Sequence, residues 1–226
     1  DKPEKVWIDK DLEQVYASIE ASFPNDQVRI GGWTENEDKA IITAWSDTNP
    51  GEMYYYDRNK GKIAFIAKSR PWIDKNEMSP MLPISFKARD GLTVNGYLTV
   101  PKNSDGKNLP LIINPHGGPA SRDVWGYNPE HQFFASRGYA VLSMNFRGST
   151  GYGRSHVKMA NGQWGRKMQD DVTDSVNWAV DQGIADKDNV CIYGASYGGY
   201  AVMAGITKTP KMYKCAVNYV GVTDMG

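Results

Sequence analysis

Apolar residues in the first third of the chain fall in short, evenly spaced stretches separated by turn sequences. These stretches predict β-strands over residues 28–33, 40–45, 53–57 and 63–66. Apolar residues at helical spacing from Leu12 to Phe23 predict one helix, which Pro24 ends. Four antiparallel strands joined by tight turns are typical of one β-propeller blade or of a small meander. Because a lone blade buries too little apolar surface and no second copy is visible, we expect residues 1–82 to end a truncated propeller.

The pattern changes after residue 83. Residues 69–83 contain three prolines, and we interpret them as a linker. Beyond them, predicted strands over 84–88, 94–99, 111–114, 139–144, 190–193 and 214–219 alternate with helices over about 129–137 and 169–181. The first two strands flank Arg89-Asp90-Gly91, a hairpin signal. Strands alternating with helices after an antiparallel start predict an α/β fold, with a mostly parallel sheet covered on both faces.

The segment Gly194-Ala195-Ser196-Tyr197-Gly198 follows the apolar stretch 190–193 and opens a run of apolar residues at helical spacing. Alone, G-x-S-x-G is a weak signal, because glycine-rich turns with a serine are common. In this context it predicts the nucleophile elbow of an α/β-hydrolase, where glycines at 194 and 198 let strand and helix approach each other. We therefore expect Ser196 to be a catalytic nucleophile and residues 83–226 to be an α/β-hydrolase catalytic domain.

The partners that would activate this serine are missing from the sequence. A serine hydroxyl reacts when a base takes its proton and a carboxylate orients that base, and in this fold the order is serine, acid, histidine. After Ser196 there is no histidine and one acid, Asp224, which we interpret as a turn residue. We expect the domain to be truncated after the strand that follows the elbow, and the fragment alone to be inactive. Its missing C-terminal portion would be the partner that covers the last strand.

His116-Gly117-Gly118-Pro119 follows the predicted strand 111–114. Acyl transfer builds negative charge on the carbonyl oxygen, and each preorganised N–H donor there is worth about 10²–10³ in rate. In this fold one donor is the residue after the nucleophile, and the other comes from a glycine-rich loop after an early strand. We expect the N–H groups of Tyr197 and Gly118 to form this oxyanion hole. The alternative is an ordinary loop with a locally bonded His116.

A second glycine-rich loop, residues 145–153, follows the strand 139–144. Ligands of open α/β sheets bind at the carboxyl ends of the strands, so this loop should lie beside Ser196. We expect Arg147 and Tyr152 to bind substrate there, Arg147 through a carbonyl or a carboxylate. A structural salt bridge that pins the loop is an equally good interpretation of Arg147. The glycine spacing matches no nucleotide-binding motif, and we expect no cofactor.

The composition of the chain disfavours several classes of binding partner. The 26 basic and 26 acidic residues balance, so charge favours neither nucleic acid nor an anionic membrane. No apolar stretch approaches the roughly 20 residues that span a bilayer, and no spacing of His, Cys and Asp suggests a metal site. Cys191 and Cys215 both lie in predicted strands, and we interpret them as two buried thiols rather than a disulfide. The compartment, cytoplasmic or periplasmic, and a homo-oligomeric state stay open.

Taken together, residues 194–200, 116–119 and 145–153 resemble the prolyl oligopeptidase family, on its acylaminoacyl-peptidase and dipeptidyl-peptidase-like branch. The predicted first helix and Asn49-Pro50-Gly51 resemble the end of that family's propeller, so the resemblance covers essentially the whole chain. It implies a propeller that screens substrates by size and an α/β-hydrolase domain that cleaves short peptides. By motif, Ser196 matches the family nucleophile. The family's acid and histidine lie beyond the end of this sequence, so the resemblance assigns neither here.

All three histidines of the chain precede the elbow. A substitute base must reach within roughly 3 Å of the serine oxygen, and we expect none of the three to do so. His131 is expected on a helix remote from the strand ends, and His116 is expected to shape its own loop. His156, in a loop after the glycine-rich turn, is the least implausible substitute.

We therefore predict a serine-type peptidase that acts on short peptides through an acyl-enzyme at Ser196. A carboxylesterase or lipase shares the elbow and the oxyanion loop, but the propeller-like strands of residues 1–82 disfavour it. A non-catalytic binding module on a hydrolase scaffold is the third alternative.

Overall fold

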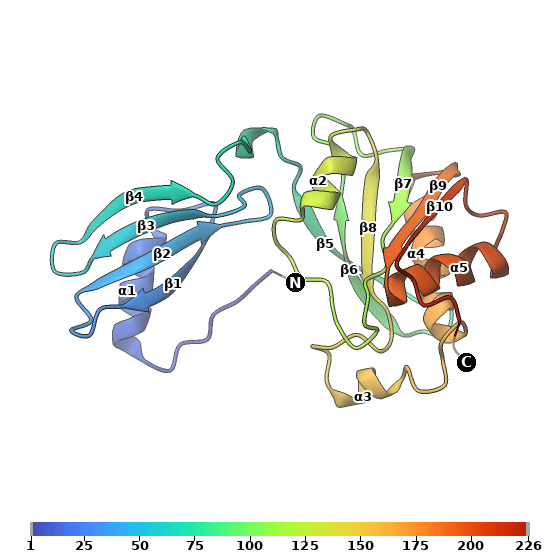
Figure 1. Ribbon diagram of the computed structural model, residues 1–226, viewed down its shortest axis with the longest axis horizontal. Helices are drawn as coiled ribbons and strands as arrows, with labels where there is room; N and C mark the ends of the chain where they lie inside the picture. The colour runs from blue at the N-terminus through green and yellow to red at the C-terminus, as the bar shows by residue number, and fades with distance from the viewer. Residues whose placement is uncertain (1, 225–226) are drawn as a thin grey trace. The chain divides into compact units, whose positions relative to one another are not determined.

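The computed structural model describes residues 2–224, which form two compact units (Figure 1). One unit comprises Lys2–Pro80 together with Trp125–Pro129, and the other comprises Met81–Val124 together with the residues from Glu130 on. The first unit therefore includes a short segment from the middle of the chain, which the apolar pattern did not indicate. That this unit ends a propeller, and that the second is a catalytic domain, stay predictions at this point.

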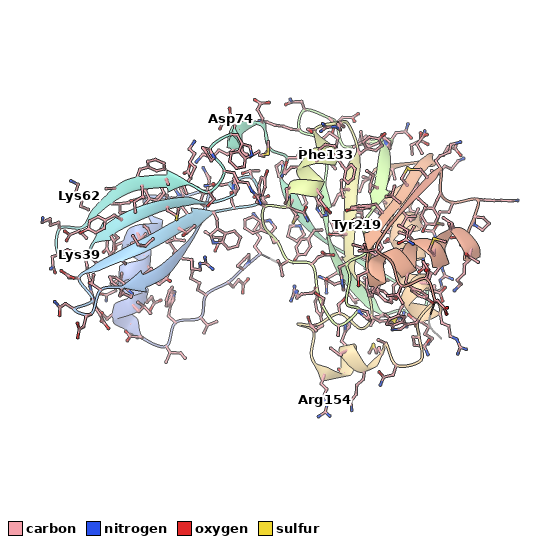
Figure 2. All side chains as sticks on the ribbon, in the orientation of Figure 1. Lys39, Lys62, Asp74, Phe133, Arg154 and Tyr219 are labelled. Carbon is pink, nitrogen blue, oxygen red and sulfur yellow. A yellow bond between two sulfur atoms is a disulfide. The ribbon has the colours of Figure 1, made fainter. Side chains whose placement is uncertain are left out.

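The first unit holds an α-helix, a short 3-10 helix (η1, Lys75–Glu77) and a four-stranded antiparallel sheet in the order β1-β2-β3-β4 (Figure 1). The elements are α1 (Lys10–Glu20), β1 (Gln27–Trp33), β2 (Lys39–Trp45), β3 (Glu52–Asp57) and β4 (Lys62–Lys68). The four strands lie where the apolar pattern predicted them, whereas α1 ends at Glu20, before the expected end at Pro24. Lys39 and Lys62 mark one end of this sheet, where both are in register with Asp57 (Figure 2).

A small apolar core holds α1 against this sheet. The helix begins after Asp9, whose carboxylate accepts hydrogen bonds from the N–H groups of Asp11 and Leu12. Along β2, buried and more exposed residues alternate, as expected for a strand with one face on the core. The buried side chains are Val15, Ile19, Val28, Ala40, Ile42 and Tyr56.

The second unit is built on a six-stranded sheet in the order β10-β9-β7-β8-β6-β5. The strands are β5 (Met81–Lys87), β6 (Thr93–Thr99), β7 (Leu109–Ile113), β8 (Ala140–Asn145), β9 (Ala185–Ala195) and β10 (Cys215–Tyr219). The pairs β10–β9, β9–β7 and β7–β8 are parallel, whereas β8–β6 and β6–β5 are antiparallel. The predicted mostly parallel α/β sheet is thus confirmed.

Helices cover both faces of this sheet. They are α2 (Pro129–Ala135), α3 (Arg154–Lys158), α4 (Lys167–Asp181) and α5 (Tyr197–Lys208), of which α3 was not predicted. Gly205 of α5 lies against Ile192 of β9, whereas Phe134 of α2 contacts the next residue, Tyr193. Successive strand residues point to opposite faces, so α5 and α2 lie on opposite sides of β9. None of the helices in residues 2–224 is long and apolar enough to span a bilayer.

The predicted linker over residues 69–83 ends too late. Met81–Lys87 form β5, so the last part of the linker belongs to the sheet, with Pro83 opposite Tyr97. Proline has no backbone N–H to donate to a neighbouring strand, and it is tolerated here because β5 is at the edge of the sheet. Pro83 therefore belongs to an edge strand, whereas Pro71 and Pro80 lie in the connection before it.

The prediction of two free thiols is wrong, because Cys191 and Cys215 form a disulfide. The strands β9 and β10 pair in parallel with these two residues directly opposite each other, and their Cα atoms are 4.7 Å apart. The side chain of Cys215, on β10, is also exposed rather than buried. A general preference of cysteine for burial could not reveal this register.

Candidate active site

Three loops leave the same edge of the sheet, because parallel strands end at a common edge. They follow β7 (residues 114–119), β8 (residues 146–153) and β9, where the chain turns sharply into α5. In the sheet β7 lies between β9 and β8. The loop after β7 is therefore the central one of the three.

Ser196 occupies the turn between β9 and α5. Its φ of +55° lies in the region that favours glycine, and the residue is exposed. The N–H of Ser196 donates to the carbonyl oxygen of Tyr219, 3.1 Å away at the end of β10. Tyr219 is labelled in Figure 2. The strained turn is thus tied to the neighbouring strand, and its hydroxyl-bearing residue faces solvent instead of packed hydrocarbon.

The two glycines of the elbow are required by close backbone contacts. A Cβ atom on Gly198 would lie 2.2 Å from the carbonyl oxygen of Pro115, and one on Gly194 would lie 2.5 Å from that of Gly198. Either distance is too short for any side chain. The predicted close approach of strand and helix is confirmed by the contact of Gly194 with Gly198, whereas the contact of Gly198 with the loop after β7 was not predicted.

The loop after β7 runs against the elbow. A Cβ atom on Gly117 would lie 3.3 Å from the carbonyl oxygen of Ala195 and 3.4 Å from Cβ of Ser196. The next residue, Gly118, has a φ of +121°, a conformation that side-chain-bearing residues rarely adopt. The sequence singled out Gly118, but the contact of Gly117 with Ser196 was not foreseen.

His116 forms hydrogen bonds within and beside this loop, as expected for a locally bonded His116. Its Nδ1 lies 2.7 Å from the carbonyl oxygen of Gly117, and its Nε2 lies 2.8 Å from Oγ of Ser149. Burial lowers the pKa of His116, which favours the neutral ring. Nδ1 faces the carbonyl oxygen of Gly117 and Nε2 faces the hydroxyl of Ser149, so the ring bridges the loops after β7 and β8.

Arg147 pins the loop after β8 through a buried ion pair with Asp171 and a partly exposed one with Asp90. Its guanidinium lies 2.6 Å from Asp171 and 2.8 Å from Asp90, and its backbone N–H also donates to Asp171. Asp171 is inaccessible to solvent, and Arg147 is 4% exposed. The two carboxylates, Asp171 first, hold the pKa of Arg147 above its ordinary value. This corrects the expectation that Arg147 binds substrate, because its donors are turned inward onto protein carboxylates.

Tyr152 lies beside Asn145 and Arg122. Its hydroxyl accepts a hydrogen bond from Nδ2 of Asn145, and the guanidinium of Arg122 lies 4.9 Å from the centre of its ring. Asn145 also bonds both the N–H and the carbonyl of Asp123. Burial raises the pKa of the Asp123 carboxyl to about 7. Asn145 is thus a positioning residue that the sequence analysis did not single out, although it directly precedes the glycine-rich turn.

The remaining histidines contact other groups. Nε2 of His131 lies 3.2 Å from Oδ1 of Asn114, the residue after β7, so His131 is closer to the strand ends than predicted. Burial lowers the pKa of His131 to about 4. Nδ1 of His156 lies 3.0 Å from the carbonyl oxygen of Ser149. In residues 2–224 no group of three His, Cys, Asp or Glu side chains is arranged to hold a metal ion.

Comparison with protein families gives one match of this chain, to the prolyl oligopeptidase family over residues 125–226. Among curated proteins, dipeptidyl aminopeptidase BIII of Pseudoxanthomonas mexicana is 42% identical over 223 residues, which cover 95% of this chain and 32% of the relative. Acylamino-acid-releasing enzyme of Sus scrofa is 29% identical over 65% of this chain and 22% of its own length. The chain thus spans about a third or less of the length of these relatives.

Solved structures of peptidases are also similar to this chain over most of its length. A puromycin-hydrolyzing peptidase of Mycobacterium tuberculosis superposes with a TM-score of 0.73 and 28% identity, over 83% of this chain and 29% of that one. An acylaminoacyl peptidase in complex with Z-Gly-Gly-Phe-chloromethyl ketone superposes with a TM-score of 0.70 and 26% identity, over 85% of this chain and 31% of that one.

Proposed function

This chain belongs to the prolyl oligopeptidase family of α/β-hydrolases, and from that membership we propose that its protein is a serine peptidase cleaving short peptides through an acyl-enzyme on Ser196. The observation that carries the proposal is the exposed Ser196 at positive φ between β9 and α5, with the backbone of Gly117 beside it.

In this mechanism Oγ of Ser196 attacks the scissile carbonyl carbon while a base takes its proton. The carbonyl oxygen becomes an anion and receives hydrogen bonds from the N–H groups of Tyr197 and Gly118. Collapse of the tetrahedral intermediate breaks the C–N bond, the protonated base gives its proton to the leaving amine, and water then hydrolyses the acyl-enzyme. The conformation of Gly118 and the position of Tyr197 as the first residue of α5 support these two roles.

We propose that the base is none of the three histidines of this chain. His116 and His156 are engaged with the loop after β8, and His131 with Asn114. The acid and the base would come from outside residues 1–226, which is consistent with the small share of its relatives that the chain spans. Asp224 is exposed beyond β10 and has no part in the proposed mechanism.

The similarity to a dipeptidyl aminopeptidase and to acylamino-acid-releasing enzymes supports short peptides as the substrate class. Tyr152 is proposed to contact the substrate, since its ring lies on the loop after β8 and is not fully buried. Residues 1–82 are proposed to be the end of a propeller, as their four-stranded antiparallel sheet supports.

The test is active-site labelling of the complete protein with a fluorophosphonate probe, followed by peptide mapping. We expect one modified residue, Ser196, and loss of both labelling and peptide hydrolysis in Ser196→Ala. Ser155→Ala, which changes an exposed serine on α3, is the matched control and should behave like the wild type.

Two outcomes would replace the proposal. Labelling of Ser196 with hydrolysis of short-chain esters but not of peptides would assign an esterase. No labelling of the intact protein would assign a non-catalytic hydrolase scaffold.

A further inference from the structure

We propose that Phe146 is a positioning residue that sets the separation of the two oxyanion donor segments. The inference rests on the proposed function, because it concerns the same two N–H groups. Phe146 is the first residue of the loop after β8. It is completely buried.

The ring of Phe146 contacts one aromatic ring from each donor segment. The imidazole of His116, two residues before Gly118, stacks on it with centroids 4.3 Å apart and planes 16° apart. The ring of Tyr197, whose N–H is the other proposed donor, packs against it with centroids 5.4 Å apart. This three-ring stack, in which the Tyr197 ring is tilted by 38° to that of Phe146, connects the loop after β7 to the first residue of α5. The thickness of the Phe146 ring is part of the spacing between these two segments.

Phe146 is itself held in place by its backbone. Its carbonyl oxygen accepts hydrogen bonds from both the N–H and the hydroxyl of Ser149. The next N–H, that of Arg147, donates to the buried carboxylate of Asp171 on α4. The side chain of Arg147 adds the ion pairs with Asp171 and Asp90. The ring thus projects from a segment that is tied to both its own loop and a core helix.

The outer rings of the stack are confined as well. Tyr197 packs edge-on against Trp164, with centroids 4.7 Å apart. His116 is fixed by its contacts with Gly117 and Ser149. Because interiors are close-packed and rings do not compress, neither donor segment can move toward the other while Phe146 is present. The backbone contacts of Gly117 with Ser196 and of Gly198 with Pro115 limit how closely the two segments approach, and Phe146 adds a side-chain contact with a ring from each of them.

An error in donor spacing should affect the transition state more than the bound substrate. The oxyanion exists only after attack, so misplaced donors lower kcat and leave KM nearly unchanged. Since one donor is worth about 10²–10³ in rate, we expect partial misplacement in Phe146→Leu to lower kcat by about 10- to 100-fold. The affinity for a peptidyl trifluoromethyl ketone, whose adduct on serine carries an oxyanion, should fall by a similar factor.

Phe86→Leu in the complete protein is the matched control. Phe86 lies on β5, is also buried, and also stacks on one aromatic ring, that of Trp178. Both variants lose a buried ring from the same core, so both should lower the melting temperature. Only Phe146→Leu should lower kcat, whereas Phe86→Leu should keep kcat and KM within about twofold of wild type.

The outcomes separate this proposal from the proposed function. If the wild-type protein is not labelled by the fluorophosphonate at Ser196, the proposed function is overturned, and this inference is overturned with it. If wild type is labelled and Phe146→Leu retains kcat within about twofold, or loses it no more than Phe86→Leu does, the positioning role is overturned. Should Phe146→Leu not fold, Phe146→Met fills the space with a flexible chain instead of a ring, and the same kinetic criteria apply.

Discussion

The elbow after β9 and the loop after β8 are held in place by different physical means. The elbow depends on backbone contacts so close that a single added carbon has no room, at Gly194 and at Gly198. The loop after β8 depends on charge, through Arg147 between Asp171 and Asp90. Because these backbone contacts leave no room for a side chain, any substitution of either glycine should have a large effect. The effect of removing a charge should instead depend on how deeply that charge is buried. The two loops should therefore fail differently when they are altered.

The largest effect is expected from Gly198→Ala. The new Cβ would lie 2.2 Å from the carbonyl oxygen of Pro115, so either the elbow or the loop after β7 must shift. We expect fluorophosphonate labelling to slow by about 100-fold or more, because oxyanion donors lie on both segments. Gly32→Ala is the control, since no atom lies within 4 Å of its added Cβ. Labelling of Gly198→Ala at the rate of the control would contradict the steric account.

Asp171→Asn should be the strongest test of the charged loop. It leaves the buried Arg147 with one carboxylate, and breaking a buried ion pair destabilises proteins by about 3–5 kcal/mol. Urea unfolding of the complete protein measures this loss. Asp90→Asn is the matched variant: its side chain is 34% exposed, so we expect a loss nearer 1 kcal/mol. Equal losses for the two variants would show that burial does not decide the strength of the clamp.

A covalent link adds to the steric fixation of the elbow strand. The double variant Cys191→Ser, Cys215→Ser removes the disulfide between β9 and β10, which should cost about 3 kcal/mol. Reduction of the wild type with dithiothreitol should lower the urea midpoint as far as the double substitution does. The midpoint of the double variant should not change with the reagent. A wild type whose midpoint is unmoved by reduction would show that hydrogen bonds alone hold β10 to the elbow.

The smallest effect is a pH dependence confined to the charged loop. Arg147 holds the pKa of Asp90 far below its ordinary value. A carboxylate with a lowered folded-state pKa stabilises the protein fully above its unfolded pKa of about 4 and loses that contribution as the pH falls further. The stability difference between wild type and Asp90→Asn should therefore be constant from about pH 5 to 7 and shrink below about pH 4. A difference that grows on acidification would contradict this sign.

Much of the framework could be predicted because its signals are local. The strands of the first unit, the alternation of strand and helix from β6 on, and the elbow all follow from residues adjacent in the sequence. The close contact between Gly194 and Gly198 confirmed the reason for which those glycines were singled out. The start of β5 was missed for the opposite reason: Pro83 reads as a linker residue unless its edge position in the sheet is known.

The sequence by itself determined the elbow, the two glycine-rich loops and the α/β layout, because side-chain periodicity and glycine spacing act over a few residues. Only the tertiary structure decided the role of Arg147, whose partners Asp90 and Asp171 lie 57 and 24 residues away along the chain. It also decided the disulfide, which depends on the register of two strands, and the three-ring stack around Phe146. These features require burial and long-range pairing, which no local pattern encodes.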